Sequence, residues 1–201
     1  MKEVVAKIRQ AEAGAEEARR AAAQKAKETE AEANAAGREA LAKAKADAAQ
    51  RAAELLEEKG YNVVLTRSED VYMDLYDRCT VANNMGADIF VSIHANASVT
   101  NLDFEGTFTY SYPESVEGER LAGFIQQSVV DAADSMDRGL LTNDYVVLRE
   151  TYMPAALLET GFMSCHRELE RLIQPEYQER LAQGVARGIE AYLATLPSKV
   201  R

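Results

Sequence analysis

Apolar and polar residues follow two different patterns along this chain, and the change falls near residue 55. Residues 1 to about 59 are rich in Ala, Glu, Lys, Arg and Gln, and aromatic or β-branched side chains almost disappear after Ile8. Such a composition is typical of strong helix formers. We therefore predict an alanine-rich helical segment over residues 1–54. The stretch L-L-E-E-K-G (55–60) that follows ends a helix at a glycine C-cap, Gly60.

The predicted N-terminal segment has few large apolar side chains. Most of its apolar positions are Ala, so a long isolated helix would bury little area. No heptad of large residues persists, which favours a solvent-facing helix or helical hairpin over a dedicated coiled coil. Self-association through this segment, or docking over an exposed sheet edge, remains an open alternative.

Downstream of residue 55, short apolar runs alternate with amphipathic segments. We predict strands at 61–67, 88–94, 105–112, 144–149 and 155–159. We predict helices at 74–85, 115 to about 135, and about 175–196. Strands that alternate with helices of this length indicate an α/β fold, a mostly parallel sheet covered by helices. We assign this domain to residues 55–201.

Composition narrows the classes of partner and location. The formal net charge of -10 argues against nucleic acid, whose phosphates require clustered Lys and Arg. We expect no transmembrane segment, because no apolar run approaches about 20 residues. The first residues contain no apolar stretch of the secretory type, so no signal peptide is expected and a cytoplasmic location stays open. The two cysteines, Cys79 and Cys165, are too few for a disulfide framework and match no metal-binding spacing.

Two residues carry the candidate chemistry. His94 closes the apolar run F-V-S-I-H-A-N-A (90–97), and ligands of open α/β sheets bind beyond strand ends. Glu159 lies within A-A-L-L-E-T-G-F (155–162), where a buried side chain would be expected. A histidine and a glutamate so placed suggest a metal-hydrolase site. Taken alone, each residue type is more often structural in such a position.

Several motifs, in order, resemble those of the zinc-dependent N-acetylmuramoyl-L-alanine amidases of bacterial cell walls, the amidase type 3 family. The resemblance covers residues 55 to about 193. Its main motifs are L-L-E-E-K-G-Y-N-V-V-L-T-R (55–67), A-D-I-F-V-S-I-H-A-N-A (87–97), E-G-T-F-T-Y (105–110), D-R-G (137–139), M-P-A-A-L-L-E-T-G-F-M-S (153–164) and P-E-Y-Q-E-R-L-A (175–182).

The resemblance implies a substrate, a reaction and a location. Such enzymes hydrolyse the amide between the lactyl group of N-acetylmuramic acid and the L-alanine of the stem peptide, so peptidoglycan is the expected partner. The family holds Zn²⁺ with two histidines and one glutamate, and a separate glutamate is catalytic. By this resemblance His94 would be the second histidine ligand, Glu159 the catalytic carboxylate and Asn96 a residue lining the substrate groove. The expected location is the bacterial cell wall or periplasm.

The chain departs from the family at its first metal-binding segment. The family begins with a strand and a G-H-G-G-like turn that supply the first histidine, but no histidine precedes His94. The alanine-rich segment stands there instead. Glu39 lies nearest to the second ligand position, two residues from the family spacing, and such an offset turns a helix by about 200°. The alternative for Glu39 is an ordinary exposed helix carboxylate. His166 is a further candidate ligand, with an ordinary loop histidine as its alternative.

Two functional classes follow from this departure. The first is a zinc-dependent peptidoglycan amidase, whose activity in the isolated chain we expect to be low because one histidine is missing. The second is an amidase-derived domain that is catalytically inactive and serves in binding or interaction.

Overall fold

The computed structural model describes residue 25, residues 48–69 and residues 71–197. The helix predicted over residues 1–54 lies mostly outside these ranges. Within the described part, residues 48–57 are helical. The elements that follow are α2 (Leu75–Met85), β1 (Phe90–Asn96), β2 (Thr107–Ser111), α3 (Val116–Ala133), β3 (Asp137–Thr142), α4 (Val146–Arg149), β4 (Ala155–Phe162), α5 (His166–Leu172) and α6 (Pro175–Leu193). No helix in the described ranges is long and apolar enough to cross a membrane.

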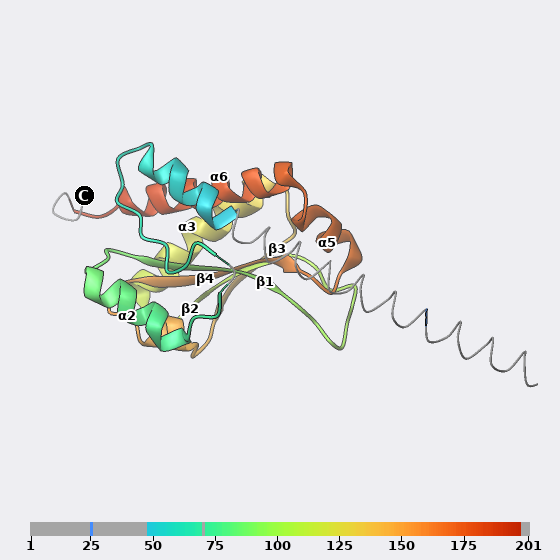
Figure 1. Cartoon of the computed structure of the whole chain (residues 1–201), viewed down its shortest axis with the longest axis horizontal. Helices are drawn as coiled ribbons and strands as arrows, with labels where there is room; N and C mark the ends of the chain where they lie inside the picture. Colours follow the sequence, from blue (N-terminus) through green and yellow to red (C-terminus); the bar gives the residue numbers. More distant parts are fainter. Residues whose placement is uncertain (1–24, 26–47, 70, 198–201) are drawn as a thin grey trace, which may run out of the picture. The chain divides into compact units, whose positions relative to one another are not determined.

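Four strands form one mixed sheet in the order β1-β4-β2-β3 (Figure 1). The pairs β1–β4 and β2–β3 are parallel, whereas β2 and β4 run antiparallel. Along the chain, α2 precedes β1, α3 lies between β2 and β3, and α4 lies between β3 and β4, whereas β1 and β2 follow each other without a helix. The predicted α/β fold with a mostly parallel, helix-covered sheet is therefore confirmed.

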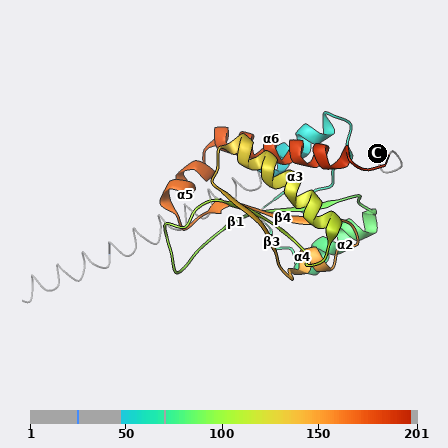
Figure 2. The same ribbon diagram turned by 180° about the vertical axis from the view of Figure 1, so that it is seen from behind.

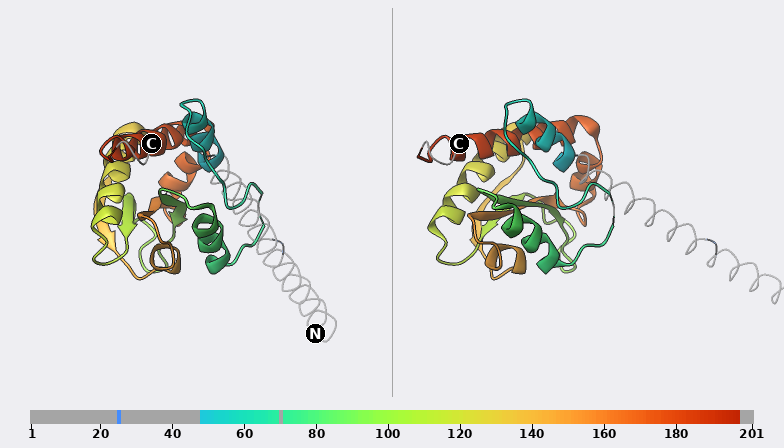
Figure 3. Two further views of the ribbon diagram at one scale, coloured as in Figure 1. Left: turned by 90° about the vertical axis from the view of Figure 1, so that its left-hand side faces the viewer. Right: turned by 60° about the vertical axis from the view of Figure 1, so that its left-hand side comes forward.

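Helices cover both faces of this sheet (Figures 1 and 2). On one face lie α3, α6 and the helix at 48–57, around a core that includes Leu121, Ile125, Leu158 and Tyr192. On the other face, α2 and α4 pack on Phe90, Ala155 and Leu157 in a smaller cluster. The two side views in Figure 3 show these layers on opposite sides of the strands.

The helix at 48–57 ends as predicted, at Gly60. The backbone N–H of Gly60 donates to the carbonyl of Glu57 at 2.9 Å, and that of Tyr61 donates to the carbonyl of Leu56 at 3.1 Å. This pair of bonds is a Schellman motif, and Gly60 takes the positive φ of 88° that the motif requires. Ala52 and Leu56 of this helix are buried in the larger core. The boundary drawn between residues 54 and 55 stays a prediction.

Two predicted strands are wrong in the described structure. Residues 61–67 are extended, but no strand among the described residues pairs with them. Tyr61 and Val63 still pack on the larger core, while Val64 is exposed. The alternating pattern of this segment therefore reflects burial of one side, although its backbone is not hydrogen-bonded to a neighbouring strand among the described residues. Residues 144–149 contain the short helix α4, because a four-residue apolar run suits a buried helical turn as well as a strand.

Two elements were not predicted from the sequence. Strand β3 is an edge strand whose side chains are mostly exposed, so D-R-G-L-L-T (137–142) has no buried apolar face to reveal it. Helix α5 has only seven residues, with Glu168 and Leu172 buried. The helices at 74–85, 115–135 and 175–196 are confirmed as α2, α3 and α6, within a few residues at each end.

Helices α3 and α6 approach closely because α6 carries two glycines one turn apart. A Cβ added at Gly184 would lie 2.7 Å from the Cα of Val129, and one at Gly188 would lie 2.7 Å from the Cα of Ile125. Both obstacles are backbone atoms in the centre of α3, so they cannot move aside as a flexible side chain would. The two glycines therefore set the distance between these helices.

We predict that Gly188→Ala lowers the free energy of unfolding by about 1–3 kcal/mol through this steric conflict. The loss should occur although alanine is favoured over glycine in a helix by about 1 kcal/mol. Gly123→Ala in α3 is the matched control, since its Cβ would meet only Leu140 Cδ1, at 3.7 Å. Urea denaturation of both variants tests this, and equal effects would contradict it.

Candidate functional site

His94 and Glu159 lie side by side on neighbouring strands. In the parallel β1–β4 pairing, His94 is the register partner of Glu159. Phe90 and His94 lie an even number of residues apart on β1, and so do Leu157 and Glu159 on β4, so all four side chains point to the same face of the sheet. Helices α2 and α4 pack on this face, against Phe90 and Leu157. The structure therefore brings together the two residues that the sequence singled out.

The imidazole of His94 has a neighbour on its own strand. His94 Nε2 lies 2.8 Å from the hydroxyl oxygen of Ser92, which is two residues earlier and on the same face. Ser92 is itself buried, with 8% of its surface exposed, whereas His94 is partly exposed. This contact orients the imidazole ring from the Nε2 side.

A row of aromatic rings follows the same sheet face. Glu159 is the register partner of Phe108 on β2. Phe108 packs against Phe162 with ring centroids 5.8 Å apart, and Phe162 packs edge-on against Phe104 at 4.9 Å. Towards the other end of the row, Tyr110 meets Tyr145 at 5.3 Å. The carboxylate of Glu159 therefore lies beside a largely apolar wall.

Tyr110 stays a neutral phenol in this environment. Burial raises the pKa of Tyr110 to about 12, and the nearby Tyr145 and Glu159 add to the shift. Burial disfavours the phenolate, and so does a neighbouring carboxylate. At neutral pH Tyr110 is therefore an uncharged phenol, and a side-chain hydrogen bond with Tyr145 contributes to the raised pKa.

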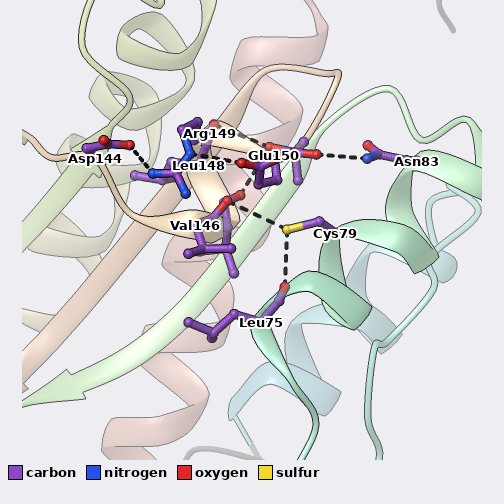
Figure 4. A network of polar contacts seen from close by, with 10 residues as sticks. Leu75, Cys79, Asn83, Asp144, Val146, Leu148, Arg149 and Glu150 are labelled. Atoms are coloured by element: carbon purple, nitrogen blue, oxygen red, sulfur yellow. Dashed lines mark hydrogen bonds and ion pairs between the residues drawn. The ribbon is translucent and has the colours of Figure 1, made fainter.

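The position of Tyr145 depends on contacts between α2 and α4, which Figure 4 shows. The thiol of Cys79 donates to the carbonyl of Leu75 at 3.2 Å and to that of Val146 at 3.7 Å. Asn83 donates from Nδ2 to the carbonyl of Glu150 at 2.8 Å. Tyr145 is the N-cap residue of α4, and its ring meets that of Tyr110 edge-on, so these bonds position the helix that carries it.

Just after Glu159, strand β4 contains an irregularity. The three residues of β1 from His94 to Asn96 lie opposite four residues of β4, from Glu159 to Phe162. Thr160 Oγ1 donates to the carbonyl of His94 at 2.9 Å, and the N–H of Met163 donates to that of Asn96 at 2.7 Å. The two strand ends are thus tied together around the candidate site.

A buried carboxylate braces this irregularity from α5. Glu168 Oε1 accepts the N–H of Gly106 at 3.0 Å, and its Oε2 accepts the N–H of Phe162 at 2.5 Å. Burial raises the pKa of Glu168, and the two N–H donors offset part of this rise. Gly161 allows the close approach, because its φ is 154° and an added Cβ would lie 3.1 Å from Glu168 Oε2. The sequence analysis missed this residue, since α5 itself was not predicted.

The other predicted site residues lie in different surroundings. Asn96 follows His94 on β1 and is half-buried, and its Oδ1 accepts the N–H of Ala97 at 2.8 Å. Glu39 lies outside the described residues. His166 begins α5 with 85% of its side chain exposed, and its Nε2 lies 3.1 Å from Glu170 of the same helix. The structure therefore does not bring His166 to His94.

The donors on this face do not fit a three-ligand zinc site. Hydrolytic zinc is held by three protein ligands drawn from His, Cys, Asp and Glu, with water in an open position. Among residues 48–69 and 71–197, no three such side chains gather closely enough to hold a metal ion. His94 and Glu159 contribute one nitrogen and one carboxylate.

Comparisons with known proteins identify the family of this chain. The sequence profile described as N-acetylmuramoyl-L-alanine amidase matches residues 26–191, which is most of the chain and begins upstream of the predicted match. The chain belongs to this amidase family. A crystal structure of N-acetylmuramoyl-L-alanine amidase from Clostridium difficile 630 superposes with a TM-score of 0.73 and 36% identity, over 76% of this chain and 83% of that one.

Two relatives of this amidase-family chain come from Bacillus subtilis. Its sporulation-specific N-acetylmuramoyl-L-alanine amidase is 38% identical over 135 residues, which is 67% of this chain and 51% of the relative. The uncharacterized protein YqiI is 33% identical over 144 residues, which is 72% of this chain and 70% of that protein. The chain thus spans about half the length of the sporulation-specific relative.

We predict that Gly161→Ala lowers the free energy of unfolding by about 2–3 kcal/mol, since it combines backbone strain with a conflict at Glu168. Gly139→Ala is the matched control: its φ is 81°, but an added Cβ meets nothing within 4 Å. That variant should lose only about 1 kcal/mol, the cost of the left-handed conformation. Chemical denaturation measures both, and a larger loss at Gly139 would refute the role given to Glu168.

Proposed function

We propose that this chain hydrolyses the amide bond between the lactyl group of N-acetylmuramic acid and the L-alanine of the stem peptide in peptidoglycan. The observation that carries the proposal is the register pairing of His94 with Glu159 on one sheet face, within a chain of the amidase family. The relatives whose names include this activity lend further support.

Glu159 is the proposed catalytic carboxylate. Amide hydrolysis needs a base to take a proton from the attacking water and an acid to give one to the leaving amine. A single carboxylate can serve both steps in turn. The Oε2 atom of Glu159 is buried, so bulk water does not compete freely for it. The reaction leaves a carboxylic acid on the lactyl group and a free amino group on L-alanine.

Neighbouring side chains would bind and orient the substrate. Asn96 is the proposed lining residue: its Oδ1 accepts the N–H of Ala97, so its Nδ2 is the atom that would donate to a substrate carbonyl. Tyr110 would line the site as an uncharged phenol beside Glu159. The rings of Phe104 and Phe108 supply an apolar wall that limits water around the reacting amide.

The family implies Zn²⁺, which polarises the scissile carbonyl and lowers the pKa of a bound water. His94 is the proposed ligand in the described part of the chain, and Glu39 stays a candidate outside it. Because the described donors do not reach three, no step above is assigned to the metal.

We further propose that the chain acts at the bacterial cell wall or in the periplasm, where its substrate is found. Names of relatives that include cell wall amidase support this location. Self-association through residues 1–54 is retained as a proposal, to be tested by the molar mass of the full chain in solution.

The test is release of stem peptides from purified peptidoglycan at saturating zinc in the buffer. We expect new L-alanine amino termini with the wild-type chain, and at least about a 100-fold lower rate with Glu159→Gln, which removes the proton acceptor.

The matched control for this experiment is Glu119→Gln, which changes an exposed carboxylate on α3 and should leave the rate unchanged. If the wild-type chain releases no stem peptide at any zinc concentration, hydrolysis is refuted and the inactive binding domain is the better description.

A further inference from the structure

The exposed aromatic side chains of this molecule gather around one helix. The chain contains nine tyrosines, five phenylalanines and no tryptophan, and every one of these rings lies in the described ranges. Three of the rings are strongly exposed, Tyr72 at 88%, Tyr76 at 55% and Tyr152 at 88%, and the rest are buried or half-buried. We call these three side chains the tyrosine surface. Because an aromatic ring in solvent adds nothing to the core, their gathering indicates a binding surface.

Two members of the tyrosine surface are spaced along α2. Tyr76 lies in the first turn of this helix, and Asn83 lies seven residues later, on the same side and about 10 Å further along the axis. Asn83 Oδ1 accepts the N–H of Tyr152 at 3.0 Å, and its Nδ2 donates to the carbonyl of Glu150 at 2.8 Å (Figure 4). The amide of Asn83 therefore fixes the backbone of Tyr152 two helical turns away from Tyr76.

The third member, Tyr72, precedes α2 on a stretch of backbone that is held on both sides. The carbonyl of Val71 accepts Nη1 of Arg67 at 3.1 Å. The carbonyl of Met73 accepts Nε and Nη2 of Arg78 at 3.2 and 3.0 Å. The ring of Tyr72 thus extends into solvent from a fixed backbone, so a ligand that packs on it orders few additional groups.

The first half of α2 lies close to the candidate site. Cys79, one turn into the helix, contacts the carbonyl oxygen of Val146 with its Sγ at 3.7 Å. The residue before Val146 is Tyr145, whose ring meets that of Tyr110 at 5.3 Å. Tyr110 in turn lies near the carboxylate of Glu159, which contributes to its raised pKa. A polymer whose reacting amide lies at Glu159 can therefore extend to the tyrosine surface.

The side chains around these rings suit a sugar better than an acidic peptide. Asp77, Thr80 and Asn84 are exposed on α2 after Tyr76, and they are acidic or uncharged. The faces of a pyranose ring present C–H groups that pack on an aromatic ring, while its hydroxyl and acetamido groups bond to amides, hydroxyls and carboxylates. Carboxylates of a peptide would be repelled by the acidic side chains. The chemistry of the surface thus favours a saccharide.

We propose that the tyrosine surface binds the glycan strand of peptidoglycan, with sugar rings stacked on Tyr72, Tyr76 and Tyr152. The inference rests on the proposed function, in which N-acetylmuramic acid carries the amide that reaches Glu159. The three rings take no part in hydrolysis. They give the chain affinity for the polymer in addition to its contacts with the single sugar at the candidate site.

The experiment measures the affinity of the full chain for soluble glycan strands freed of stem peptides, by isothermal titration calorimetry. These strands contain no scissile amide, so binding is measured independently of hydrolysis. We expect wild-type protein to bind them, and the triple variant Tyr72→Ala, Tyr76→Ala, Tyr152→Ala to bind at least about tenfold more weakly. Because the chain has no tryptophan, quenching of tyrosine emission is a second readout of ring contact.

Two controls separate stacking on the rings from general effects. The triple variant Tyr72→Phe, Tyr76→Phe, Tyr152→Phe keeps the rings and should bind within about twofold of wild type. Val116→Ala truncates an apolar side chain that is 69% exposed on α3, and it should leave the affinity unchanged. Far-ultraviolet circular dichroism checks that each variant folds. If the triple alanine variant does not fold, the three single alanine variants decide, and each should weaken binding.

Three results would overturn the inference. They are wild-type protein that does not bind the stripped strands, alanine variants that bind them as tightly as wild type, and wild-type protein that prefers free stem peptides to the stripped strands. Stem-peptide release from intact peptidoglycan is scored separately. Release without binding of stripped strands contradicts only this inference, whereas binding without release contradicts only the proposed hydrolysis.

Discussion

The parallel pairing of β1 with β4 is the constraint on which the candidate site depends. Side chains alternate between sheet faces, so a slip of one residue would move Glu159 to the face opposite His94. The register is held on one side by the apolar pairs from Phe90–Ala155 onward. It is held on the other by the irregularity after Glu159, where the Glu168 carboxylate accepts the N–H of Phe162. A buried charge remote from the chemistry thus helps to set which residues face each other.

The layers around the sheet explain why this register persists. The two glycines of α6 let its backbone approach α3, and the larger core fills the space between these helices and the sheet. On the opposite face α2 and α4 cover only part of the strands, near Phe90 and Leu157. The part of this face that contains His94 and Glu159 lies further along the strands, next to the aromatic rings of Phe108 and Phe162. One tightly packed face therefore supports a second face that carries the polar groups.

The pattern of apolar and polar residues predicted the strands and helices that bury one face or all of their side chains. The runs ending at His94 and containing Glu159 are apolar and β-branched, so their strands were predictable, and the Gly60 cap was read from glycine chemistry. Residues 61–67 were misassigned because alternation reports burial and not the presence of a pairing partner. Strand β3 and the brace from Glu168 depend on contacts between segments distant in sequence, which leave no local signal. The adjacency of His94 and Glu159 likewise required the pairing of β1 with β4, and Glu39 lies outside the described residues.

The stability of this domain and its capacity to hold metal depend on different residues. The core is made of aliphatic and aromatic side chains from α3, α6 and β4, and none of them is a metal ligand. Loss of a nitrogen donor therefore costs the fold little, in contrast to small metal-dependent domains, where metal binding supplies the folding free energy. The pairing of β1 with β4 is enough to place Glu159 beside His94, whereas a set of three metal ligands needs side chains from several segments. A family domain can consequently retain its sheet and its Glu159–His94 pairing without a complete set of metal ligands among the described residues of the same face.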